Sequence, residues 1–148
     1  MTSWSFQWIK ERVSLVAGLV VISGIVFAVL QFRQSERLER QRVAIEAITH
    51  LRSEAFIDAF LRIKTSVAAG HYNLPSLHRD IRYVVSWYDH VAILYLSGLA
   101  DQCVVKHTIY YSASEMAEIL NALEKPYPPE LRRNFDLLLN RMAADPCG

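Results

Sequence analysis

The chain has 148 residues, of which 52% are hydrophobic, and its 16 basic and 15 acidic residues leave a formal net charge of +1. This length holds one membrane span and one small domain of roughly 100 residues, but not two folded domains. Because the net charge is close to zero and no basic tail or patch stands out, the composition argues against nucleic acid as a partner.

An uncharged stretch, VSLVAGLVVISGIVFAVLQF, occupies residues 13–32 and is apolar on every side of a helix. At about 1.5 Å of rise per residue it gives about 30 Å of helix, which is the hydrocarbon thickness of a bilayer. We therefore predict a transmembrane helix at 13–32, after a short N-terminal flank at 1–12. A cleaved export signal is the alternative, but its apolar region is shorter and ends in a small-x-small site, which is missing before Arg33.

Aromatic and basic residues flank this stretch, as expected of side chains that lie at a membrane interface. The predicted interface anchors are Trp4, Trp8, Lys10, Arg12, Arg33 and Arg37. Two basic residues precede the span, whereas five arginines follow it closely: Arg33, Arg37, Arg40, Arg42 and Arg52. Because basic residues favour the cytoplasmic side, we expect a single-pass inner-membrane protein with its C-terminal domain in the cytoplasm.

Small residues line one side of the predicted span at a spacing of about 3.5 residues, which is the spacing of a helix–helix interface. The stripe consists of Ser14, Ala17, Gly18, Val21, Gly24 and Ala28, and its small residues include the pairs Ser14–Gly18 and Gly24–Ala28. Small side chains allow two helix backbones to approach closely in lipid. This stripe predicts either self-association or docking on a larger membrane partner, although such residues are also common in membrane spans.

The rest of the chain predicts an all-α fold, since no alternating strand pattern of useful length occurs. No Gly or Pro lies between Arg33 and Ala69, so the span is expected to continue as one long helix, first as a polar stalk at 33–47. A small helical bundle then occupies 48–145. Its remaining helices are expected at about 77–97, 101–110, 112–125 and from Pro129 onward, with breaks at Gly70, Gly98 and the PYPPE turn. Asp101 is the expected cap of the second of these helices, and Ser112 or Ser114 is expected to open the third.

The order SWYDHVAILYLSGLADQCVVKHTIYY … ELRRNFDLLLNRM resembles an uncharacterised family of short bacterial membrane-anchored helical proteins, known only as a domain of unknown function. The matching positions are Tyr88–Asp89, Gly98, Asp101, Arg132 or Arg133, and Phe135. The resemblance covers residues 77–142 and the anchor. It implies a membrane-anchored helical fold and brings no activity, cofactor or ligand with it.

Residues capable of chemistry are few and scattered. Cys103–His107 and Glu46–His50 have the i, i+4 spacing of metal ligands on a helix, but each pair offers only two ligands. No nucleophile elbow or Gly-rich phosphate loop occurs, so no catalytic residue, metal, cofactor or small-molecule substrate is predicted. Cys103 and Cys147 are expected to be free thiols in a reducing compartment, with a disulfide as the alternative.

Asp89 stands beside aromatic residues on an otherwise apolar helix, where a buried carboxylate would need a partner. Arg132 or Arg133 on the last helix is the expected partner in a structural ion pair. The alternative is a general acid or base.

These patterns together favour a non-enzymatic, single-pass membrane protein whose cytoplasmic helical domain mediates protein–protein interaction. The exposed segments SLHRDIRYVV (76–85) and PELRRNFD (129–136) are candidate docking faces. One alternative is an accessory subunit of a larger membrane complex. Another is a membrane-tethered enzyme or metal-binding regulator.

Overall fold

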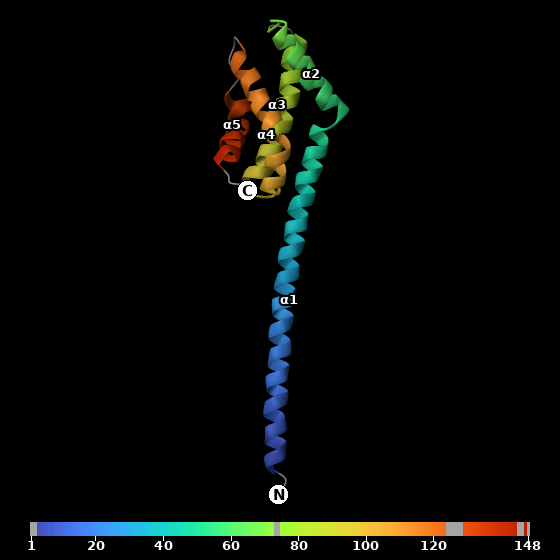
Figure 1. The fold of residues 1–148 in the computed structure, drawn as a ribbon, viewed down its shortest axis with the longest axis vertical. Helices are drawn as coiled ribbons and strands as arrows, with labels where there is room; N and C mark the ends of the chain where they lie inside the picture. Colours follow the sequence, from blue (N-terminus) through green and yellow to red (C-terminus); the bar gives the residue numbers. More distant parts are fainter. Residues whose placement is uncertain (1–2, 73–74, 124–128, 145–146, 148) are drawn as a thin grey trace. The chain divides into compact units, whose positions relative to one another are not determined.

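A computed structural model describes residues 3–72, 75–123, 129–144 and 147, and the side chains among them from residue 16 to 123 and from 132 onward. Five helices and no strand occur in these ranges, which confirms the all-α class (Figure 1). The helices are α1 (Ser3–Leu51), α2 (Glu54–Ala68), α3 (Pro75–Leu96), α4 (Gln102–Ala122) and α5 (Pro129–Ala144).

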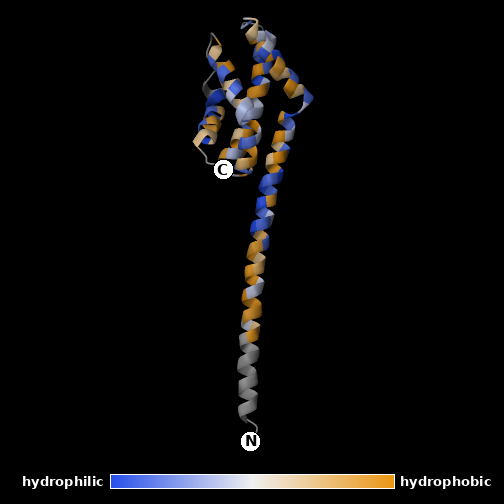
Figure 2. Ribbon diagram, in the orientation of Figure 1, coloured by the Kyte–Doolittle hydropathy of each residue, from blue (hydrophilic) through white to orange (hydrophobic). Residues whose placement is uncertain are grey.

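The chain divides into two compact units, Met1–Leu38 and Glu39–Gly148. The first unit consists of the N-terminal part of α1, and its coloured part changes from hydrophobic to hydrophilic toward its C-terminal end (Figure 2). Within the described residues, α1 is the one helix long and apolar enough to cross a membrane, and none of its most apolar 18-residue window is buried. The side chains of the predicted anchors Trp4, Trp8, Lys10 and Arg12, and of Ser14, lie outside the described part of the chain.

The predicted small-residue stripe is exposed along its described part, from Ala17 to Ala28. A Cβ atom added at Gly18 or Gly24 would meet no described atom within 4 Å. Both positions therefore have room for the close approach of another helix. Helix–helix packing along this stripe stays a prediction.

The second unit is built around α3, which packs against α2 and α5, while α4 packs against α5 and α3 (Figure 1). Its largest fully buried side chains include Tyr88, Tyr95 and Phe135, each with 0% exposure. The C-terminal part of α1, from Glu39 to Leu51, belongs to this unit, and its last two turns place Ala44, Ala47, Ile48 and Leu51 in the core. The compact unit thus begins at Glu39, inside the segment that the sequence predicts to be a polar stalk.

The expectation of one uninterrupted helix up to residue 69 is wrong, because α1 ends at Leu51 and α2 begins at Glu54. Ser53 takes an extended conformation, and its hydroxyl accepts a hydrogen bond from the backbone N–H of Phe56 at 3.3 Å. A serine in this position satisfies one of the free N–H groups at the start of a helix. A single capping serine therefore breaks the helix without any Gly or Pro.

The two short helices expected at 101–110 and 112–125 are one helix, α4. Asp101 caps it as predicted, since its carboxylate accepts hydrogen bonds from the N–H groups of Cys103 and Val104, both at 3.1 Å. Neither Ser112 nor Ser114 opens a helix, because α4 runs through both positions, and the Ser112 hydroxyl donates to the carbonyl of Ile109 within that helix. Gly70 and Gly98 follow α2 and α3 with φ of +73° and +71°, as their predicted roles at helix ends require.

The expectation of free thiols is also wrong, because Cys103 and Cys147 form a disulfide and no described cysteine is free. Cys103 lies in the first turn of α4, and Cys147 follows the end of α5. Since these two helices pack against each other, the two Cα atoms lie 5.4 Å apart, within the usual disulfide range. A separation of 44 residues in sequence carried no signal of this proximity.

Candidate functional site

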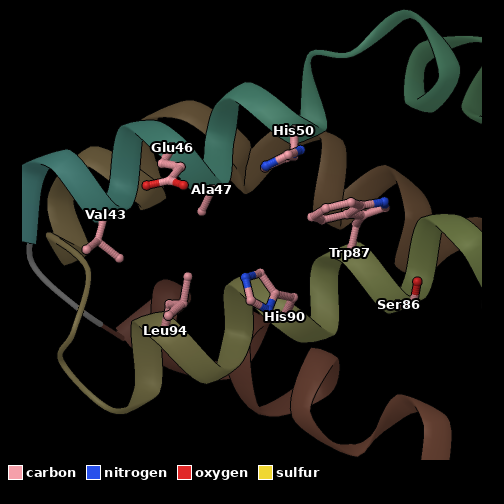
Figure 3. Close-up of a pocket in the computed structure, with 8 residues that line it drawn as sticks. All are labelled: Val43, Glu46, Ala47, His50, Ser86, Trp87, His90 and Leu94. Atoms are coloured by element: carbon pink, nitrogen blue, oxygen red, sulfur yellow. The ribbon is translucent and has the colours of Figure 1, made fainter.

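The candidate site is a groove of about 510 Å³ between the C-terminal part of α1 and α3, entirely within the second unit (Figure 3). Eight residues line it: Val43, Glu46, Ala47 and His50 from α1, and Ser86, Trp87, His90 and Leu94 from α3. On each helix these residues recur at three- and four-residue intervals, so each set lies on one side of its helix. We call this feature the α1–α3 groove.

The aromatic rings of His50, Trp87 and His90 form one side of the α1–α3 groove (Figure 3). The His50 ring stacks on the Trp87 indole with centroids 4.7 Å apart and an interplanar angle of 14°. His90 meets the same indole edge-on at 6.0 Å and 88°. Trp87 is half-buried, whereas both histidines are exposed, so the indole is fixed in place while one part of it faces solvent.

The other residues that line the α1–α3 groove form an apolar part and a charged part. Val43, Ala47 and Leu94 are buried or half-buried and form the apolar part, whereas the Glu46 carboxylate is exposed. A groove with an apolar floor and a few polar groups at its margins is the general form of a binding site for a side chain or a small ligand. The groove therefore offers an aromatic anchor together with hydrogen-bonding and charged groups.

Among the described residues, no group of three or more His, Cys, Asp or Glu side chains is placed to hold a metal ion. Of the two predicted i, i+4 pairs, Glu46–His50 lies in the α1–α3 groove, while Cys103–His107 loses its thiol to the disulfide. His107 instead contacts the carbonyl of Cys103 through Nδ1 at 2.8 Å.

Arg132, the expected partner of Asp89, instead donates to Asp136 one turn along α5, at 2.8 Å. Asp89 is half-exposed, so burial does not force it to find a partner. The buried carboxylate belongs to Asp80, which is 5% exposed and accepts two hydrogen bonds from Arg62 on α2, at 2.8 and 3.2 Å. The Arg62 guanidinium holds the pKa of Asp80 below its usual value.

Tyr88 lies at the centre of the second unit and contacts the rings of Phe56 and Phe135. Its hydroxyl is buried and has no hydrogen-bond partner at bonding geometry within the described residues. Burial raises the pKa of Tyr88 to about 12. In the resemblance, Tyr88 was paired with Asp89 as one motif, but only Tyr88 is a core residue.

Sequence reasoning missed the α1–α3 groove and the Asp80–Arg62 pair. Asp80 had a signal, since it follows Leu77 by three residues and precedes Val84 by four, which places it on the core side of α3. For the α1–α3 groove, the sequence indicated only the α1 side, through the i, i+4 spacing of Glu46 and His50. The residues that line the groove from α3 could not be predicted, because their position depends on how the two helices pack.

The described residues thus define a helical domain that follows a long apolar helix and carries a groove on its surface. A model of the family described as "Domain of unknown function (DUF4760)" matches residues 18–142, so the chain belongs to this family. This confirms the resemblance to an uncharacterised family. Searches of curated proteins and of solved structures found no similar protein.

Proposed function

We propose that this chain is a single-pass membrane protein whose helical domain binds a protein partner through the α1–α3 groove. The observation that carries the anchoring part is the wholly exposed apolar stretch of α1. Burying apolar surface is favourable by roughly 25 cal/mol per Å², and a helix that is apolar on all sides requires lipid or another helix around it. Stable membrane attachment then raises the effective concentration of any membrane-bound partner.

The binding part rests on Trp87. Tryptophan is among the residues that contribute most to protein–protein binding energy, since it offers a large rigid surface with a polar N–H. Stacking on His50 fixes the Trp87 ring before a partner arrives, which lowers the entropy lost on binding. We infer binding rather than catalysis because both groove imidazoles are exposed to water, whereas catalytic groups generally act in water-excluded sites.

We place the helical domain in the cytoplasm, since basic residues are more numerous on the C-terminal side of the span. The disulfide weighs toward an oxidising compartment, but Cys103 is exposed, which leaves the bond open to reduction by cytoplasmic thiols. Protease added to intact spheroplasts should then spare the domain and digest it only after lysis. Digestion before lysis would place the domain outside the cytoplasm.

The test of the binding role is purification of the full chain from native membranes in mild detergent, with groove and control variants compared. Trp87→Ala and His90→Ala are expected to reduce recovery of a stoichiometric partner roughly tenfold or more, as loss of a central interface residue does. Tyr111→Ala is the control, because Tyr111 is 86% exposed and outside the groove. Equal recovery with all three variants would remove the groove from the binding role.

Two alternatives give different results in the same preparation. A partner complex of several membrane subunits recovered at fixed stoichiometry would identify the chain as an accessory subunit. One equivalent of bound metal, lost in the His50→Ala variant, would favour a metal-binding regulator or a tethered enzyme.

A further inference from the structure

The second unit has a cluster of exposed apolar side chains where α3 ends and turns into α4. Ile93 and Leu96 lie one turn apart on α3, and Leu99 follows in the turn, with exposures of 51%, 40% and 57%. The turn itself is well fixed: Gly98 has positive φ, and the N–H groups of Leu99 and Ala100 donate to the carbonyl of Leu94. We call Ile93, Leu96 and Leu99 the turn cluster.

Contacts within the second unit place this turn beside the start of its α1 segment. Trp87 of α3 stacks on His50, whereas the N–H of Asp101, just after the turn, donates to the carbonyl of Arg40 at 3.0 Å. Helix α3 is therefore antiparallel to the α1 segment of the second unit. The turn cluster lies at the edge of the second unit from which the chain continues to the apolar stretch.

The chain between this edge and the predicted span is short. Arg40 follows Phe32, the last residue of the uncharged stretch, by eight positions along one helix. At about 1.5 Å per residue this connection spans at most about 12 Å, roughly one helix diameter, so the edge of the second unit lies no farther than that from the end of the predicted span. Arg33 and Arg37 on this segment carry charges suited to anionic headgroups.

We propose that the turn cluster of Ile93, Leu96 and Leu99 is a second membrane contact, which inserts into the interfacial layer of the bilayer that holds the span. The inference rests on the proposed membrane anchoring. Leucine and isoleucine side chains at that depth exchange water for acyl chains, and the short connection supplies the bilayer at high effective concentration. The contact limits rotation of the domain about its anchor and leaves the α1–α3 groove open to a partner.

The test uses the full chain in vesicles of phosphatidylethanolamine and phosphatidylglycerol, in a background with Trp4, Trp8 and Trp87 replaced by Phe. One variant carries Leu99→Trp, and the matched control carries Leu61→Trp on α2, where the leucine is exposed to a similar degree, 52%. Lipids brominated near the carbonyl end of the acyl chains should quench Leu99→Trp emission at least about twofold more than Leu61→Trp emission, because interfacial side chains lie roughly 5–10 Å into this layer.

Flotation of the vesicles separates failure of this inference from failure of the anchor. If the chain floats with the vesicles but Leu99→Trp and Leu96→Trp are quenched no more than Leu61→Trp, the membrane contact is overturned and the anchor stands. If the chain does not float, the anchor and the contact both fall. A concentration-dependent emission shift without quenching would assign the cluster to a second copy of the chain and would overturn the lipid contact.

Discussion

The charged form of the Asp80 carboxylate is stabilised in the folded state. Its side chain is 7% exposed, and it is held by Arg62 from the neighbouring helix α2, with Arg79 at 3.8 Å. Arg62 is itself 55% exposed, so the pair combines a buried carboxylate with a hydrated guanidinium. This arrangement avoids desolvating the cation while satisfying the carboxylate, and it fixes α2 against α3.

Replacement of this carboxylate tests the pair. Asp80→Asn is expected to lower the free energy of unfolding at pH 7 by about 1 kcal/mol, since a charge-assisted hydrogen bond is lost but Arg62 remains in contact with water. Chemical denaturation of the full chain, followed through the near-ultraviolet dichroism of the aromatic core, measures the change. Asp89→Asn is the matched control on α3 and should have almost no effect.

The Asp80–Arg62 pair also predicts how the free energy of unfolding changes at acidic pH. The pKa of Asp80 is lowered in the folded state, so its contribution is complete above the ordinary value of 3.8 and is lost as the pH falls through the folded pKa. Below pH 3.8 the wild-type and Asp80→Asn chains should therefore approach one another in stability. A difference that persists unchanged into strong acid would show that the variant acts through packing instead.

At the scale of elements, the break between α1 and α2 depends on one cap. Ser53 stops the helix that the apolar stretch begins, and this allows α2 to leave the direction of α1 and bury Phe56, Ala59 and Ile63. Helix propensity alone favours continuation, because the segment holds neither Gly nor Pro. The capping bond and the apolar side of α2 together outweigh that preference.

Removal of the cap should destabilise the second unit without altering its core. Ser53→Ala is expected to cost about 1 kcal/mol, the usual value for loss of an N-cap hydroxyl. Thr65→Ala on the same helix is the control, since Thr65 is exposed and its hydroxyl only bonds to carbonyls of its own helix. Equal midpoints for the two variants in urea would mean that packing of α2 sets the break and the cap does not.

At the scale of the whole molecule, one covalent bond closes the second unit. The disulfide joins Cys103 in the first turn of α4 to Cys147, which follows α5. Helix α5 is also held by three buried side chains, Phe135, Leu138 and Met142. Because these side chains are fully buried, α5 has its own apolar attachment. The bond adds stability to a packing that the core already specifies.

Reduction should therefore weaken the second unit without dismantling it. For a loop of 44 residues, the chain-entropy model gives about 4 kcal/mol of stabilisation from the disulfide. A reductant should lower the unfolding midpoint of the wild-type chain but leave that of Cys147→Ser unchanged. Identical wild-type midpoints with and without reductant would mean that the bond does not form in the isolated protein.

The amino-acid sequence by itself determined the helical class, the apolar stretch, the cap at Asp101 and the breaks at the two positive-φ glycines, because each depends on a few neighbouring residues. It also determined which residues of α3 are apolar, through their spacing along one helix. The tertiary structure decided the disulfide, the Asp80–Arg62 pair and the α1–α3 groove. Each of these joins side chains from two elements, and the distance between elements is set by packing, which no local pattern encodes.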